Sequence, residues 1–197
     1  MNILHIDFCG VRFENPLVLA SGILGVTGSS MAAVANGGAG GVTSKSWWAH
    51  AHEGHANPVV IAENGVMLNA VGLPDAGITK HSEEIKEYRA KAQAPFIASI
   101  VAGSVEDFAE VTQKTAALGP DIIEVNISCP NVSEEFGDLF SSGCQSAALM
   151  TKLVKQHSGN IPVSVKLSPN VPDIGAVAKA CEDNGADAIT AINTVGP

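Results

Sequence analysis

The feature that most constrains the fold is a regular alternation between short β-branched runs and stretches of helical character. Five stretches carry helix signals, such as serine or acidic residues at the start and glycine at the end; they span residues 29–37, 78–92, 104–119, 144–159 and 174–186. After a hairpin expected at residues 3–13, strands are expected at residues 16–20, 40–45, 95–101, 121–128, 161–168 and 187–194. This repetition predicts a parallel sheet, either an open doubly wound sheet or a (β/α)8 barrel.

The positions of the polar residues favour the barrel. Polar side chains occur in each expected strand or directly after it, namely Ser21, Lys45, Ser99, Asn126, Lys166, and Asn193 with Thr194. A barrel brings these strand ends together around one mouth, where its active site lies. A dinucleotide-binding sheet fits less well, because no GxGxxG follows the first strand and the "GGAGG" at residues 37–41 precedes a strand. We therefore predict an α/β fold, a (β/α)8 TIM barrel, of which this chain carries an N-terminal hairpin and about the first six βα units.

The length of the chain predicts a single domain over residues 1–197. Its 197 residues, 46% of them hydrophobic, supply one ordinary core. A complete barrel has eight βα units in about 250 residues, so we interpret the chain as the first three-quarters of a longer protein. Barrels often bind a ligand's phosphate after strands seven and eight. Residues for that purpose are therefore expected beyond residue 197.

Charge and composition narrow the class of partner. Eleven basic against twenty acidic residues give a net charge of −9, and a surface of this sign repels nucleic acid. No apolar run approaches the roughly 20 residues of a membrane span, and the first residues lack the features of a signal peptide. A cytoplasmic protein without a membrane partner is expected. The four cysteines form no CxxC pair, which predicts reduced thiols instead of a zinc site or a disulfide framework.

Six segments of the sequence resemble the class 1 dihydroorotate dehydrogenases. In chain order they read "NPLVLASG", "TSKS", "NPVVIAENGVMLNAVGLP", "EVNISCPNV", "VKLSPNV" and "AINT", and the resemblance covers essentially the whole chain. "NAVGL" and "KLSPNV" are most similar to the catalytic subunit of the NAD-linked (B) type. The resemblance implies an FMN-dependent oxidoreductase that oxidises dihydroorotate to orotate in de novo pyrimidine biosynthesis.

The resemblance gives Cys129 of "SCPN" the role of catalytic base. In that family this cysteine removes the C5 proton of dihydroorotate while the hydrogen at C6 passes as hydride to N5 of FMN. A thiol suits the task because its ordinary pKa of about 8.5 lies near working pH. Cys9, Cys144 and Cys181 lack such a context, and buried core positions are expected for them.

Amide side chains are suited to a flat pyrimidine ring, because each offers both a donor and an acceptor. By resemblance the substrate-binding residues are Lys45, Asn69, Ala70, Val71, Gly72, Leu73, Asn126, Asn131, Asn193 and Thr194. By the same resemblance FMN is bound by Ser21, Lys45, Ser46, Ser99, Asn126, Lys166 and Ile192. Lys166 would face the N1 and O2 edge of the flavin, where a positive charge stabilises the anionic reduced ring. No metal ligand is expected.

The NAD-linked type implies partners as well as a cofactor. An electron-transfer subunit carrying FAD and a 2Fe-2S cluster would pass electrons to NAD. The catalytic chains would form a homodimeric core within a heterotetramer. The sequence by itself leaves the electron acceptor and the oligomeric state open.

Three alternatives remain beside this interpretation. Relatives that reduce uracil share the architecture but usually carry histidine at the position of Asn131, so asparagine favours orotate. His50 and His52 form an HxH pattern, as in metal-dependent amidohydrolases, but there it ends the first strand, whereas residues 46–55 follow the second and are expected to be a solvated loop. A truncated polypeptide that binds no flavin and acts only as an interaction partner is the third.

One residue departs from the family pattern. Asp75 stands where relatives commonly carry asparagine, and it would add a negative charge close to an anionic substrate.

Overall fold

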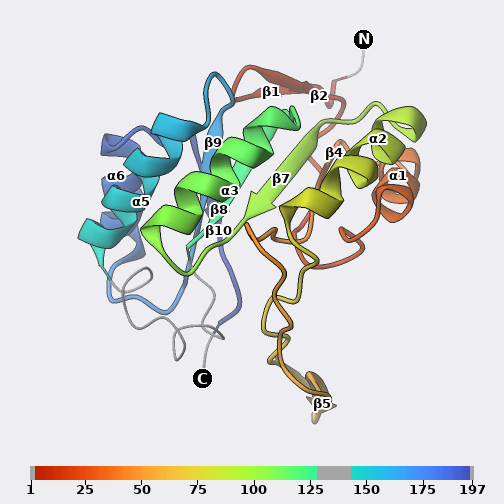
Figure 1. Cartoon of the computed structure of the whole chain (residues 1–197). Helices are drawn as coiled ribbons and strands as arrows, with labels where there is room; N and C mark the ends of the chain where they lie inside the picture. Colours follow the sequence, from red (N-terminus) through yellow and green to blue (C-terminus); the bar gives the residue numbers. More distant parts are fainter. Residues whose placement is uncertain (1–2, 128–142, 196–197) are drawn as a thin grey trace.

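The computed structural model describes residues 3–127 and 143–195. Its centre is a six-stranded parallel sheet in the order β10-β9-β8-β7-β4-β3. The strands are β3 (Val18–Leu19), β4 (Gly41–Thr43), β7 (Phe96–Ile100), β8 (Ile122–Asn126), β9 (Val163–Leu167) and β10 (Ala188–Ala191). Each expected strand segment contains one of these strands. The sheet curls into part of a barrel (Figure 1), which confirms the predicted fold class.

Helices cover the outer face of the sheet, as Figure 1 shows. They are α1 (Gly28–Asn36), α2 (His81–Lys91), α3 (Val105–Ala117), α5 (Cys144–His157) and α6 (Ile174–Asp183), with the 3-10 turn η1 (Ile78–Lys80) before α2. The Ser104 side chain caps α3 by accepting from the Asp107 amide. In α1 the cap is Thr27, which forms a capping box with Ser30. The five helical stretches are therefore confirmed, with a threonine cap two positions before the serine pair expected to cap α1.

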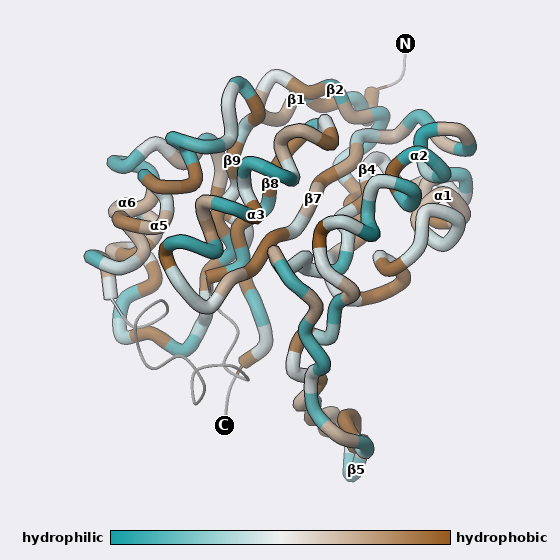
Figure 2. Tube along the Cα trace, in the orientation of Figure 1, coloured by the Kyte–Doolittle hydropathy of each residue, from teal (hydrophilic) through white to brown (hydrophobic). Residues whose placement is uncertain are grey.

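The two faces of the sheet differ in chemistry. Alternate residues of a strand face opposite sides, and the outward ones, including Ile123 and Val165, pack in one cluster with Phe108 of α3 and Met150 of α5. This layer is the main core (Figure 2). At the amino-terminal ends of the strands the inner face is also apolar, since Ile122 packs with other apolar residues there. Toward the carboxyl ends of the strands the inner face becomes polar.

The inner apolar layer is closed by an N-terminal hairpin. Strands β1 (Ile6–Phe8) and β2 (Val11–Phe13) pair antiparallel, as predicted. The Phe13 side chain is fully buried against Ile97 of β7 and Ile122 of β8. The hairpin thus covers the amino-terminal end of the sheet, which leaves the carboxyl ends of the strands open for a site.

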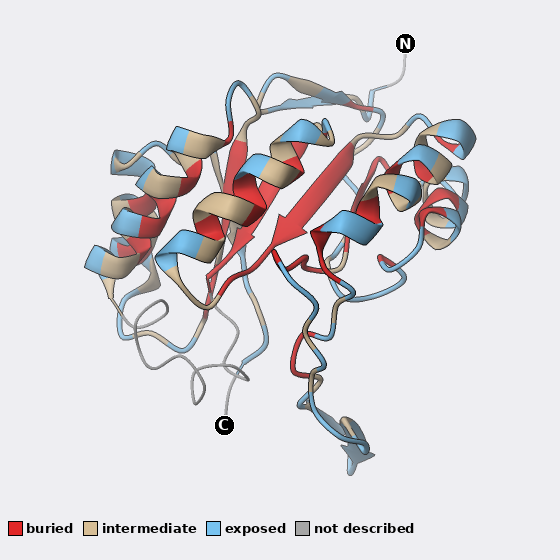
Figure 3. Ribbon diagram, in the orientation of Figure 1, coloured by how far each residue is buried: buried red, intermediate tan, exposed pale blue. Residues whose placement is uncertain are grey.

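A second hairpin was not predicted. Strands β5 (Val60–Glu63) and β6 (Val66–Asn69) pair antiparallel and project from the body of the molecule, with exposed side chains (Figure 3). Asn64 and Gly65 both have positive φ, of 51° and 80°. An Asn-Gly pair between apolar runs is a strong signal for such a turn. The signal is present in "VVIAENGVMLN", residues 59–69.

The cysteines in the described residues have different surroundings. Cys181 is buried in the main core, as expected. Cys9 is only partly buried and packs against the Phe13 cluster. Cys144 is exposed at the start of α5, so its expected core position is wrong. Neither described part of the chain contains a helix long and apolar enough to cross a membrane.

Candidate active site

A cavity of about 510 Å³ lies at the carboxyl ends of the sheet strands. Its volume falls within the range usual for small-molecule and cofactor sites. Most of the predicted site residues line it, namely Ser21, Lys45, Ser46, Asn69, Val71, Gly72, Leu73, Asn126, Lys166, Ile192, Asn193 and Thr194. The cavity is also lined by Gly22, Ile23, Val60 and Met67, which the sequence did not single out. Two of these, Val60 and Met67, come from the unpredicted β5–β6 hairpin.

The other predicted site residues lie beside the cavity or outside the described residues. Ser99 is fully buried below it, with its hydroxyl 3.0 Å from that of Ser46. Ala70 belongs to the segment that forms one wall, although it does not line the cavity. Cys129 and Asn131 fall within residues 128–142 and so lie outside the described part of the chain.

A chain of hydrogen bonds orients the amides at the cavity. Asn126 Nδ2 donates to Ser46 Oγ at 3.3 Å, and Asn193 Nδ2 donates to Asn126 Oδ1 at 3.1 Å. Asn193 Oδ1 in turn accepts from the Thr194 amide at 2.8 Å. These bonds join the loop after β4 to the ends of β8 and β10. The amides are therefore held in place before any ligand binds, as is required for the specific recognition of a polar ring by hydrogen bonds.

Two lysines give this acidic protein a local concentration of positive charge. Lys45 follows β4, Lys166 belongs to β9, and both line the cavity. In the sheet, β7 and β8 lie between these two strands, so the cations lie at different points of the wall. Such a pair attracts an anionic ligand to a molecule whose overall charge would repel it.

The wall formed by residues 69–73 is held by the segment that precedes the hairpin. The His55 amide donates to Val71 O at 3.2 Å, and the Trp48 indole donates to Leu73 O at 2.9 Å. Gly72 has φ +73°, and a β-carbon there would lie only 2.7 Å from His55 N. Glycine is required at this point because a side chain would push the two segments apart.

The expected solvated loop is only partly present, since residues 50, 51, 53 and 55 are exposed but residues 46–49 are buried. Trp47 and Trp48 are buried, and their rings stack on His81 and His52, with centroids 4.5 and 4.4 Å apart. The indole planes are nearly parallel to the imidazoles, at 11° and 5°. The adjacent tryptophans thus anchor this segment to the body of the protein, which sequence reasoning missed.

The Asp75 carboxylate lies in a polar network next to this wall. It accepts hydrogen bonds from His81 Nε2 at 2.7 Å and from the Trp48 and Gly77 amides at 3.0 Å each. Burial alone would raise the pKa of Asp75, but the bonds from His81 and the two amides hold it below its usual value. Asp75 lines a neighbouring cavity of about 610 Å³, not the one that contains Asn126 and Asn193. The hydrogen bonds from His81 and the two amides thus stabilise its charge locally, and Lys45 and Val71 of the predicted substrate site line both cavities.

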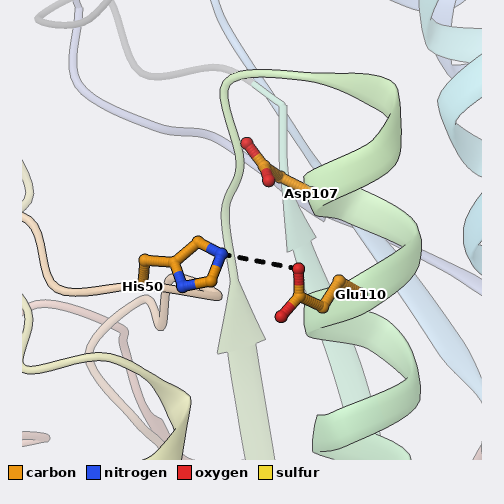
Figure 4. A group of neighbouring side chains, drawn as sticks. All are labelled: His50, Asp107 and Glu110. Atoms are coloured by element: carbon orange, nitrogen blue, oxygen red, sulfur yellow. Dashed lines mark ion pairs between the residues drawn. The ribbon is translucent and has the colours of Figure 1, made fainter.

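The three histidines of residues 50–55 go to three different partners. His50 extends toward α3, where its Nε2 is 3.5 Å from Glu110 Oε2, with Asp107 beside it (Figure 4). Glu110 also binds Lys114, and this bond is the main reason why its pKa is lowered. His52 stacks on Trp48, while His55 Nδ1 is 3.0 Å from Ala70 O. Within residues 3–127 and 143–195, the HxH pattern therefore does not bring its two histidines to one point.

Comparisons with known proteins agree with this geometry. A sequence model of the dihydroorotate dehydrogenase family matches residues 3–196. The catalytic subunit of dihydroorotate dehydrogenase B (NAD(+)) from Methanocaldococcus jannaschii is 42% identical over 196 residues, which are 98% of this chain and 63% of that protein. The subunits of the same name from Methanosarcina mazei and Thermoplasma acidophilum are 42% and 40% identical, over 94% and 98% of this chain and 59% and 62% of theirs. The chain thus spans about three-fifths of the length of these relatives. It belongs to the dihydroorotate dehydrogenase family.

Proposed function

We propose that this chain carries most of the active site of an FMN-dependent dihydroorotate dehydrogenase, which oxidises dihydroorotate to orotate in pyrimidine biosynthesis. The observation that carries the proposal is a single cavity, which is lined by Lys45, Lys166, Asn69, Asn126 and Asn193. Amides and ammonium groups suit a flavin and an anionic pyrimidine, because both ligands present alternating donors and acceptors around flat rings. The family match and the names of the relatives support the same activity.

The predicted site residues in the described part of the chain divide into two proposed groups. Ser21, Ser46, Ser99, Lys166 and Ile192 would hold the flavin, while Asn69, Asn193, Thr194 and the backbone of residues 70–73 would hold the substrate. Lys45 and Asn126 would touch both ligands. The hydrogen bonds that link Asn126 to Ser46 and to Asn193 support this arrangement, because they connect the two groups.

Cys129 is proposed as the base that removes the C5 proton of dihydroorotate. Bound FMN supplies the acceptor for the two electrons and the hydrogen that leave C6. The chain's own contribution is to orient the ring through its amides, so that C5 faces the thiolate. It also places the positive charge of Lys166 at the cavity, where it favours an anionic ligand.

We propose an electron-transfer partner on the basis of the relatives' names. Each is the catalytic subunit of an NAD(+)-type enzyme, which implies a separate subunit that completes the reaction. FAD and a 2Fe-2S cluster on that subunit, a homodimeric core within a heterotetramer and a cytoplasmic location stay predictions. Purified catalytic chain alone should reduce NAD poorly, and efficient NAD reduction without an added subunit would contradict the partner.

The deciding experiment is anaerobic titration of the purified, FMN-loaded protein with dihydroorotate. We expect loss of flavin absorbance at 450 nm, on the order of one flavin per chain, with stoichiometric formation of orotate. Dihydrouracil serves as the matched control, because it lacks only the carboxylate, and it should leave the flavin oxidised. A protein that takes up no FMN would favour a non-catalytic interaction polypeptide. Bound zinc together with hydrolysis of dihydroorotate would favour the amidohydrolase.

A further inference from the structure

A carboxyl group lies inside the barrel, one layer below the cavity. Glu124 belongs to β8 and is only 5% exposed. It has the same orientation as Asn126, because residues two apart in a strand share a face. Its Cα partners are Ser99 of β7 and Ser164 of β9, so it lies among the inner polar residues, away from the apolar core.

The hydrogen bonds of Glu124 are few for an ionised group. Thr190 Oγ1 donates to its Oε2 at 3.1 Å, and the Ser164 hydroxyl lies 2.9 Å from that of Thr190. Within the described residues, Oε1 has no hydrogen-bond partner. A buried carboxylate needs several donors to replace the water that it loses. In so buried a site the neutral acid is favoured over the carboxylate, because it has far less hydration to lose.

Lys166 supplies a positive charge that acts on Glu124. It follows Ser164 on the inner face of β9 and lines the cavity above, and its Cα partners are Asn126 and Thr190. Burial raises the pKa of Glu124, and the positive charge of Lys166, together with the hydroxyl groups of Thr190 and Ser99, opposes this effect without cancelling it. The net charge of Glu124 and Lys166 together therefore depends on whether Glu124 carries a proton.

We propose that Glu124 is a proton-holding positioning residue, which is neutral below Lys166 at neutral pH and, at the higher pH where it is ionised, takes up a proton when negative charge develops on the ligand above. With Glu124 neutral, the lysine charge is available to that ligand. With Glu124 ionised, the two charges largely compensate each other and the ligand loses this stabilisation. The identity of the ligand rests on the proposed function, in which FMN becomes anionic on reduction, whereas the protonation of Glu124 does not.

Infrared difference spectroscopy tests the proton itself, with or without FMN. The parent protein at neutral pH should show a carboxylic-acid C=O band that disappears in Glu124→Gln, a variant that keeps the size and the acceptor oxygen. Glu182→Gln, an exposed change on α6, should keep the band. A parent spectrum without any band that Glu124→Gln removes would overturn the proposal, whatever the protein binds.

The midpoint potential of bound FMN, measured against pH, tests the coupling. In the parent, the potential should fall more steeply with pH where Glu124 titrates, because reduction there takes up one more proton. Glu124→Gln should lose this extra slope and have the higher potential at alkaline pH. Thr190→Val removes a donor to the ionised carboxylate, so the pH range in which the potential falls steeply should move to higher pH. If Glu124→Gln does not fold, this variant tests the coupling in its place. Equal slopes in the parent and both variants would overturn the coupling, whereas absence of flavin would contradict only the proposed function.

Discussion

Asn193 Nδ2 donates to Asn126 Oδ1 at 3.1 Å, across the mouth of the barrel and between residues 67 positions apart in sequence. The bond fixes which end of each amide faces the cavity. Asn126 uses its oxygen for Asn193 and its nitrogen for Ser46. The orientation of one substrate-binding amide therefore depends on the other.

This dependence leads to the first prediction. Asn193→Ala should weaken orotate binding by more than one direct hydrogen bond would, about tenfold or greater, because Asn126 also loses its partner. FMN affinity should change less. Spectral titration of the FMN-loaded protein with orotate measures both effects, and Asn36→Ala, a distant change at the end of α1, is the matched control. An unchanged orotate affinity would remove Asn193 from the site.

Gly72→Ala should disturb the wall of the cavity. The change imposes a positive φ on alanine, at about 1–2 kcal/mol, and in addition forces the new methyl group against His55 N. Gly119→Ala is the matched control, since Gly119 has φ +69° and no atom within 4 Å of the new carbon. Thermal unfolding should show a larger loss for Gly72→Ala, and only that variant should bind orotate more weakly. Equal effects of the two changes would show that the contact with His55 is unimportant.

The lowered pKa of Asp75 predicts that the free energy of unfolding decreases at low pH. A carboxyl whose pKa is lowered in the folded state stabilises it above the unfolded pKa, about 3.9, and this contribution is lost as the pH falls through the folded value. Asp75→Asn should therefore lower the free energy of unfolding at pH 7, and the difference from the parent should shrink at low pH. Urea titrations at several pH values measure this, with exposed Asp7→Asn as the control. A difference that stays constant with pH would argue against an ionised Asp75.

Tyr88 allows a direct optical test, because it is the only tyrosine in the sequence. Burial raises its pKa to about 12, and its hydroxyl donates to Ala94 O at 2.6 Å. Tyrosinate absorbance should thus appear near pH 12 in the folded protein and near pH 10 in denaturant. Its contribution to stability is complete below the unfolded pKa and is lost as the pH rises through the folded one. Titration of folded protein with a midpoint at about 10 would contradict the burial.

Cys129→Ser should slow reduction of bound FMN by dihydroorotate by orders of magnitude at neutral pH, because a serine hydroxyl is a far weaker acid than a thiol. The defect should diminish as the pH rises, and flavin binding should barely change. Cys144→Ser, at an exposed position, is the control and should leave the rate near that of the parent. Anaerobic stopped-flow spectroscopy measures both rates. A Cys129→Ser variant that reduces its flavin at the parental rate would exclude the cysteine as base.

Much of the fold could be predicted because local patterns determine it. The β-branched runs and the caps at Ser104 and Gly119 mark strands and helices without any knowledge of tertiary contacts. The cavity residues could be predicted because a barrel brings strand ends together, and because the motifs around Asn126 and Lys166 are specific. The buried position of Glu124 among polar groups could also have been predicted, since a charged residue inside the apolar run "IIEVN" must face something polar.

Other features depend on contacts between distant segments, which sequence patterns do not show. Asp75 was interpreted only as a charge near the substrate, and no sequence pattern indicates its bond to His81, on which Trp47 stacks. The burial of Trp48 follows from its bond to Leu73, 25 residues away. No periodicity within residues 46–55 indicates either contact.

The cavity draws on residues from Ser21 to Thr194, so it exists only after β10 has joined the sheet. A ribosome-bound chain that has released only β3 to β8 lacks Lys166 and Asn193. Ligand capture therefore has to wait for β10, and it reports that this strand has docked correctly. A ligand at a hundred times its dissociation constant would then stabilise the fold that contains β10 by about 2.7 kcal/mol, and no intermediate without β10 would gain from it.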